Sequence, residues 1–357
     1  MNKKPEILYN EAIEVLSALI RLPSFSKEES QTAGYLTNYL FDKGVEVTRA
    51  GNNVLARNKF FDETKPTLLL NSHHDTVKPN SNYTKNPFQP TIEDGKLYGL
   101  GSNDAGGCMV SLMMTFLHFY GEENLKYNLV FAATAEEEIS GPNGIQSALN
   151  NLPKIDSAIV GEPTLMQMAV AERGLMVLDC IAKGKAGHAA REEGENAIYK
   201  AIKDIDWMRN YHFEKISALL GPVKMSVTSI ETENKAHNVV PAECKFVVDV
   251  RVNELYTMEE VLETIKTNVQ SEVTARSTRL RSSSISLDHT LVKAGLSLGK
   301  KYYGSPTTSD KALMSFPALK MGPGDSGRSH TADEYIYVEE IKSGIHEYIK
   351  LLELVML

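Results

Sequence analysis

Separate segments of the chain carry histidine and carboxylate side chains in settings that suit metal binding. They contain His73 and Asp75, Asp104, Glu136-Glu137-Glu138, Glu162, and His330. Each has an ordinary alternative when taken alone: Asp104 could be a helix N-cap, and the run of acids a solvated loop. Together they supply histidines and several carboxylates, a nitrogen and oxygen ligand set that suits zinc, cobalt or manganese better than copper.

The spacing within two of these segments adds chemical detail. On an extended strand end, residues i and i+2 point the same way, so His73 and Asp75 can act together while His74 points elsewhere. A carboxylate beside a ligating imidazole is the usual partner of the ring's other N–H. Adjacent acids repel one another unless a cation neutralises them, so residues 136–138 favour a cation site. A two-metal site, with ions roughly 3.5–4 Å apart, also needs a bridging carboxylate and can activate a shared water.

Short apolar runs place these segments at the ends of buried strands. The runs cover residues 67–75, 128–138 and 157–164, and they alternate with helical stretches such as residues 106–120. This alternation predicts parallel strands in an α/β sheet, where functional sites lie beyond the carboxyl ends of the strands. Further helices are predicted near residues 6–21, 27–43, 289–302 and 338–355. A capping box formed by Ser26 and Glu29 would begin the second of them.

The pattern of polarity changes after residue 173. Residues 174–185, 223–230 and 244–252 alternate as half-buried antiparallel strands do, and helical stretches lie near residues 196–210 and 257–274. A chain of 357 residues also exceeds the size at which one core usually stops growing. We therefore expect an α/β catalytic domain, a mixed sheet with flanking helices, formed by residues 1–173 and 286–357. Residues 174–285 would form an inserted α+β domain.

Composition limits the partners and the compartment. The formal net charge is -8 and the pI is about 5.7, which argues against a nucleic-acid partner. The three cysteines are far apart and form no metal or disulfide pattern, so we expect them to be buried, reduced thiols. Acidic residues interrupt the N-terminal apolar positions, and no run of about 18 apolar residues exists. We expect a cytoplasmic enzyme with no membrane partner.

The motifs, in their order along essentially the whole chain, resemble the dinuclear-zinc aminoacylase and carboxypeptidase family. That family includes acetylornithine deacetylase and succinyl-diaminopimelate desuccinylase. The resemblance implies a zinc-exopeptidase-like fold and two divalent ions, zinc by preference with cobalt or manganese as alternatives. The implied ligands are His73 and Glu162 for one ion, Glu138 and His330 for the other, and Asp104 as the bridge. Asp75 would orient His73, and Glu137 would be the general base.

The inserted segment matches the same family. Its motifs are Gly187-His188-Ala189-Ala190, Asn238-Val239-Val240-Pro241-Ala242 and Asp249-Val250-Arg251. The resemblance implies a lid and dimerisation domain, through which a homodimer forms and His188 reaches into the partner's active site. Asn238 and Arg251 would hold the substrate carboxylate, and an ordinary salt bridge is the alternative for Arg251.

The resemblance also implies the reaction, the hydrolysis of a small N-acyl amino acid. The compact chain and its Gly322–Ser326 motif favour N-acetylornithine as substrate, and hence arginine biosynthesis. A desuccinylase, an acetylcitrulline deacylase, a lysine-carrier hydrolase and a di- or tripeptidase are alternatives. A non-catalytic metal-binding scaffold is disfavoured because Glu137 is present. Two positions depart from the family pattern: Leu100 stands where arginine is frequent, and Gly106 where lysine is frequent.

Overall fold

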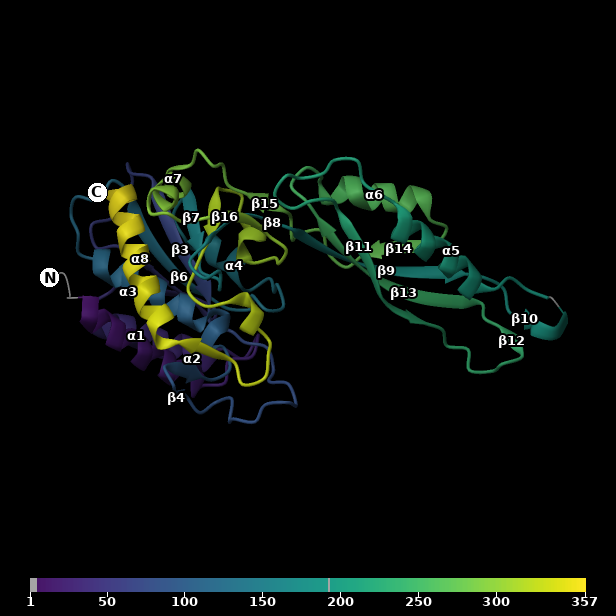
Figure 1. Ribbon diagram of the computed structural model, residues 1–357, viewed down its shortest axis with the longest axis horizontal. Helices are drawn as coiled ribbons and strands as arrows, with labels where there is room; N and C mark the ends of the chain where they lie inside the picture. The colour runs from purple at the N-terminus through teal and green to yellow at the C-terminus, as the bar shows by residue number, and fades with distance from the viewer. Residues whose placement is uncertain (1–4, 192) are drawn as a thin grey trace. The chain divides into compact units, whose positions relative to one another are not determined.

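The computed structural model describes residues 5–191 and 193–357, which divide into two compact units. Unit 1 comprises Met1–Val170, Ser284–Tyr303 and Ser309–Leu357. Unit 2 comprises Ala171–Ser283 and Gly304–Thr308. The predicted class, a mixed sheet with flanking helices plus an inserted domain, is confirmed (Figure 1).

A mixed sheet in the order β1-β2-β6-β3-β7-β17-β8-β15 forms the centre of unit 1, and β16 pairs with β8. Its central strands β3 (Thr67–His73), β6 (Asn128–Thr134) and β7 (Ser157–Val160) are fully buried and pair in parallel, as predicted. The other strands are β1 (Val47–Ala50), β2 (Asn53–Arg57), β8 (Met168–Glu172), β15 (Ser283–Ser284), β16 (Tyr302–Ser305) and β17 (Ala318–Lys320). A smaller sheet joins β18 (Tyr335–Tyr337), β5 (Lys96–Tyr98) and β4 (Thr91–Glu93).

Both faces of the central sheet are covered, which explains its continuous apolar strands. Leu68 and Leu70 face the core shared with the helices α1, α3 and α8, whereas Leu69 faces a second core that includes α4. The helices of this unit are α1 (Pro5–Ile20), α2 (Ser30–Asp42), α3 (Gly107–Phe119), α4 (Ile145–Leu149), α7 (Thr290–Ser297) and α8 (Val338–Met356). Short helical turns are η1 (Ser102–Gly106), η3 (Asp310–Leu313) and η4 (Ser326–Arg328). Within the described ranges, no helix combines the length and apolarity that a membrane crossing requires.

The capping box predicted for Ser26 and Glu29 is wrong. The helix α2 begins at Ser30, and Glu29 occupies its N-cap without a side-chain cap bond. The Ser26 hydroxyl instead donates to the carboxylate of Asp75 at 2.7 Å, because an ionised acceptor makes a stronger hydrogen bond than a neutral one. The helix predicted to begin at Lys27 therefore begins later, at Ser30, and Lys27 lies outside it with a left-handed φ of +77°.

A four-stranded antiparallel sheet in the order β11-β13-β9-β14 forms unit 2, which confirms the predicted antiparallel pairing. Its strands are β9 (Gly174–Lys183), β11 (Lys224–Glu231), β13 (Glu243–Val252) and β14 (Glu272–Ala275), with a further pair, β10 (Gly187–His188) and β12 (Val239–Val240). The helices α5 (Ala197–Asn210) and α6 (Met258–Asn268) pack on the alternating apolar face of β9 and β13, and η2 spans Ala189–Arg191. The helix predicted to reach residue 274 ends at Asn268, because residues 272–275 pair with β9.

Candidate metal centre

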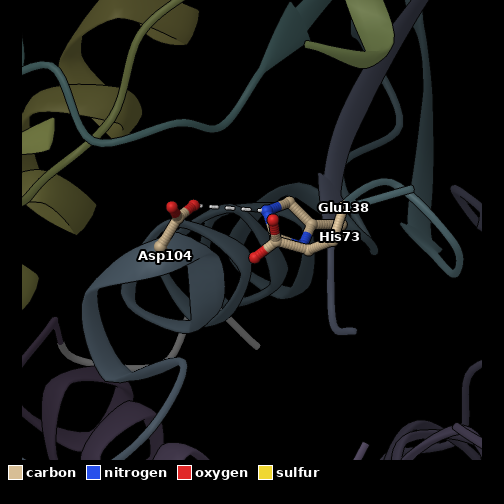
Figure 2. A group of neighbouring side chains, drawn as sticks. All are labelled: His73, Asp104 and Glu138. Carbon is tan, nitrogen blue, oxygen red and sulfur yellow. Dashed lines mark ion pairs between the residues drawn. The ribbon is translucent and has the colours of Figure 1, made fainter. Parts of the chain in front are cut away.

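The predicted metal-binding segments meet at one edge of the central sheet. In the parallel pairing, His73 lies opposite Thr134, so the end of β3 lies beside the acidic loop that follows β6. Glu162 follows the neighbouring strand β7. Asp104 comes from the turn η1 before α3, and His330 from the loop after η4. Figure 2 shows His73 and Asp104 facing each other, with Glu138 beside the imidazole.

The two carboxylate oxygens of Asp104 face two different histidines. Its Oδ1 lies 3.4 Å from Nε2 of His73, and its Oδ2 lies 3.6 Å from Nε2 of His330. On the first side, His73 Nε2 is also 3.9 Å from Oε1 of Glu162. On the second side, His330 Nε2 is 3.0 Å from Oε2 of Glu138. A carboxylate that presents one oxygen to each half of a site has the arrangement required of a bridging ligand.

The state of the His73 ring shows that this arrangement fits a metal. Its Nδ1 lies 3.0 Å from the backbone oxygen of Asp75 and 3.4 Å from that residue's carboxylate. Its Nε2 is buried and makes no hydrogen bond among the described residues, although carboxylate oxygens of Asp104, Glu162 and Glu137 lie 3.4, 3.9 and 4.0 Å from it. Such an orphaned buried nitrogen is costly unless something else takes its lone pair, as a metal ion does. Ligand atoms of His73, Asp104 and Glu138, and of His73, Glu137 and Glu162, lie within 4.8 Å of one another.

The ionisation behaviour of the acids also favours a bound cation. Burial raises the pKa of Glu162 to about 8, and it raises the pKa of Glu137 well above its usual range. The neighbouring carboxylates Glu162, Asp310 and Glu138 raise the pKa of Glu137 further. Burial alone would lower the pKa of His73, but the nearby carboxylates raise it well above its usual value. Divalent ions would supply the positive charge that such a crowded set of buried acids requires.

The three successive glutamates of the acidic loop, residues 136–138, have different neighbours. The carboxylate of Glu136 turns to Asn143, whose backbone N–H and side-chain amide donate to it at 3.2 and 2.9 Å. Glu138 pairs with His330, and this hydrogen bond raises the pKa of the imidazole to about 9. Glu137 lies with its Oε2 4.0 Å from Nε2 of His73. Glu137 and Glu138 therefore face the site, whereas Glu136 supports the loop.

A buried carboxylate that we did not predict holds the Asp104 loop. Glu334 accepts the backbone N–H groups of Gly101, Asn103 and Asp104 at 3.0, 2.8 and 2.9 Å. The Asn103 side chain also pairs with the backbone of Asp325: it donates to the oxygen at 3.0 Å and accepts the N–H at 3.1 Å. The loop that carries Asp104 is thus fixed against the segment that leads to His330. The only sequence signal was an acid four residues after a candidate ligand histidine.

Two further buried residues lie beside the site. Asp310 accepts a hydrogen bond from the Thr134 hydroxyl at 2.8 Å, and burial raises its pKa to about 6. No sequence pattern distinguished this acid. His74 points away from the site, as its place in the strand predicted: its ring nitrogens lie 2.9 Å from Oγ1 of Thr32 and 3.0 Å from the backbone oxygen of Asn52.

The remaining predicted site residues belong to unit 2. His188 is exposed on β10 and pairs in register with Val239 of β12, and Asn238 lies in the turn directly before β12. The Arg251 guanidinium forms a two-pronged ion pair with Asp249, at 2.8 and 3.0 Å. This is the salt bridge named above as the alternative for Arg251, and it occupies one edge of the guanidinium.

The family can be decided by comparison with known proteins. A model of peptidase family M20/M25/M40 matches residues 69–354, which is most of the chain. The chain belongs to this family. The resemblance drawn from its motifs is thereby confirmed, and the protein is a member of a family of metal-dependent hydrolases.

The proteins similar to this chain include desuccinylases in the sequence comparison and a tripeptidase in the structural comparison. The chain is 27% identical over 275 residues to succinyl-diaminopimelate desuccinylase 2 of Ruegeria sp., which spans 72% of this chain and 69% of the relative. It is 30% identical over 266 residues to the succinyl-diaminopimelate desuccinylase of Methylorubrum populi, covering 68% of each. Among solved structures, a tripeptidase from Staphylococcus aureus matches with a TM-score of 0.79 at 19% identity, covering 97% of this chain and 98% of that one. That likeness shows the shared fold.

Proposed function

We propose that this M20 protein is a dinuclear metal amidohydrolase that removes the acyl group from a small N-acyl-L-amino acid. The observation that carries the proposal is the position of Asp104, whose two oxygens face His73 and His330. One ion would be held by His73 and Glu162, and the other by Glu138 and His330, with Asp104 shared. Zinc is the proposed metal, and cobalt or manganese would suit the same ligands. When bound, the ions would lower the pKa of a water and polarise the scissile carbonyl.

Glu137 is the proposed general base. Its neighbours in the acidic loop are engaged, Glu136 by Asn143 and Glu138 by His330, which leaves Glu137 to accept a proton at its carboxylate. Asp75 accepts the N–H groups of Glu137 and Glu138 at 3.1 and 3.2 Å. A base held by its own backbone keeps its carboxylate within reach of the reacting water, as proton transfer requires. The same proton would then pass to the leaving amine.

The proposed substrates share a free α-carboxylate and an acylated amine. N-acetylornithine remains our first candidate, and the desuccinylase relatives support a succinylated amino acid as its main rival. Arg251 is the proposed clamp for the α-carboxylate, through the guanidinium edge that Asp249 does not occupy.

A substrate screen tests the proposal. Acetyl-, succinyl- and peptidyl-amino acids would be incubated with the zinc- or cobalt-loaded protein, and release of the free amine would be measured. We expect turnover of at least one acyl amino acid, abolished by a chelator and restored by metal. A protein that binds metal and yet releases no amine from any of these substrates would contradict the proposed reaction.

We also propose that the protein acts as a homodimer through unit 2, in which His188 completes the partner's site. Mixing the nearly inactive variants His188→Ala and Glu137→Ala would then create one intact site in each mixed dimer. Random exchange makes about half of the dimers mixed, so roughly a quarter of the wild-type activity should return. If subunits exchange and no activity returns, His188 acts within its own chain or has no role.

A further inference from the structure

The segment before α2 contacts the ends of two strands that carry the metal-centre residues. The Ser26 hydroxyl donates to Asp75 just beyond β3, and Thr76 donates its backbone N–H to the oxygen of Ser24 at 2.9 Å. Glu29 reaches the loop after β6, where its Oε1 lies 3.2 Å from the backbone nitrogen of Glu136. The residues first interpreted as a helix cap, Ser26 and Glu29, therefore contact the segments that carry the metal-centre residues.

Glu29 is a buried carboxylate, with 0% of its surface exposed. Besides Glu136, its donors are the backbone N–H of Lys27 at 2.6 Å and the side-chain amide of Asn52 at 2.8 Å. Burying a carboxylate is expensive, and hydrogen bonds from several donors offset that cost. Such a group is held in one place, so it can fix the position of the backbone it binds.

Side chains hold four successive backbone amides of the acidic loop. Asn53 accepts the N–H of residue 135 at 3.0 Å, Glu29 accepts that of Glu136, and Asp75 accepts those of residues 137 and 138. Glu136 has a φ of +55°, a left-handed conformation that is unfavourable for a residue with a side chain. Such a conformation persists only where the surroundings enforce it. Glu29 binds the N–H of the residue at which the chain makes this turn.

We propose that Glu29 is a positioning residue: by holding the amide of Glu136 it enforces the left-handed turn that aims Glu137 and Glu138 at the metal centre. This inference rests on the proposed function, since it assigns Glu29 a role in placing the ligand and the base. Without the carboxylate, the loop would relax at Glu136, and the two side chains beyond it would shift together.

Cobalt binding to Glu29→Gln tests this role without a substrate. The matched control is Glu28→Gln, which makes the same chemical change at the adjacent, exposed residue. Co²⁺ would be titrated into wild type and both variants, and its visible absorption followed, because the bands report the ligand geometry. Of the two proposed ions, we expect the more weakly bound Co²⁺ to bind about tenfold less tightly to Glu29→Gln than to wild type, with an altered spectrum. Glu28→Gln should match wild type in both affinity and spectrum.

Kinetics with whichever substrate the screen identifies adds a second readout. We expect kcat of fully metal-loaded Glu29→Gln to fall about tenfold while KM stays within about twofold, because the base is displaced and the substrate contacts are not. A role in stability alone would lower the unfolding temperature and leave both the cobalt spectrum and kcat unchanged, and that result would overturn the inference.

A milder variant covers the case in which Glu29→Gln does not fold. Asn52→Ala removes one donor to Glu29 from a half-buried turn, and we expect changes in the same direction but smaller. An Asn52→Ala protein with unchanged cobalt affinity, spectrum and kcat would then overturn the inference. If wild type binds no Co²⁺ at all, the proposed metal centre itself fails, which is a different outcome.

Discussion

The two acids that face the metal centre should fail in different ways when neutralised. Glutamine has nearly the shape of glutamate, but it carries no charge and accepts no proton. Glu137→Gln should keep its metal and lose at least about a hundredfold in kcat, which corresponds to about 2.7 kcal/mol of activation free energy. Glu138→Gln should instead weaken metal binding. The Glu138 carboxylate lies 3.0 Å from His330, and its oxygen lies within 4.8 Å of ligand atoms of His73 and Asp104.

The assay measures metal content and turnover on the same samples. Each variant would be loaded with zinc, freed of excess metal, analysed for metal per chain, and assayed with and without added zinc. Added zinc should restore part of the activity of Glu138→Gln and none of that of Glu137→Gln. Glu123→Gln, a change at an exposed acid of the same unit, should behave as wild type. Exchanged phenotypes would place the base at Glu138 and refute our assignment.

Further outcomes follow from packing, burial and charge. Gly106→Ala should lower the free energy of unfolding in urea by about 1–3 kcal/mol. A Cβ at that position would lie 2.4 Å from the Gly101 oxygen and 2.6 Å from Leu16. The control Gly121→Ala, where a Cβ meets nothing within 4 Å, should lower it far less. The three buried cysteines should not react with a thiol reagent at neutral pH until the protein is unfolded, since burial raises the pKa of each thiol, and prompt labelling of the native protein would contradict their burial. An α-carboxamide analogue of the substrate should react much more slowly than the carboxylate, and equal turnover would count against Arg251 as the clamp.

The sequence was informative where local chemistry and local periodicity coincide. Apolar runs followed directly by His73 or by the acids after residue 134 predicted both the strands and the edge at which they meet. Leu69 faces the opposite core from its neighbours in β3, and this two-sided burial is what produces a continuous apolar run. The ends of parallel strands then leave little freedom for the side chains that follow them.

The supporting residues could not be predicted, because they act through distant backbone amides. Glu334 binds the N–H of Gly101, which is 233 positions away in the chain, and any residue type except proline can offer that donor. The pair Ser26 and Glu29 fitted a local capping pattern, but its partners are Asp75 and Glu136. The local capping pattern therefore did not form, because these side chains bind partners that only the folded chain brings near them.

The proposed metal ligands likewise do not indicate which substrate the protein uses. Desuccinylases and peptidases occur among the relatives and structural neighbours of this M20 chain, although their names describe different reactions. The acyl group is distinguished by side chains that touch the substrate and not the metal. A succinyl group differs from an acetyl group by an added CH2 and a charged carboxylate, whose recognition requires contacts outside the metal ligands. Direct assay is therefore the way to choose between acetyl and succinyl substrates.

Metal content tests the central claim most directly. The purified protein would be loaded with zinc, passed through a desalting column, and analysed for zinc per chain by elemental analysis. Because Asp104 presents one oxygen to each histidine, we predict about two zinc ions per chain. Zinc no higher than the buffer background would contradict the account, since the orphaned nitrogen of His73 and the buried acids around it would then have no cation to bind.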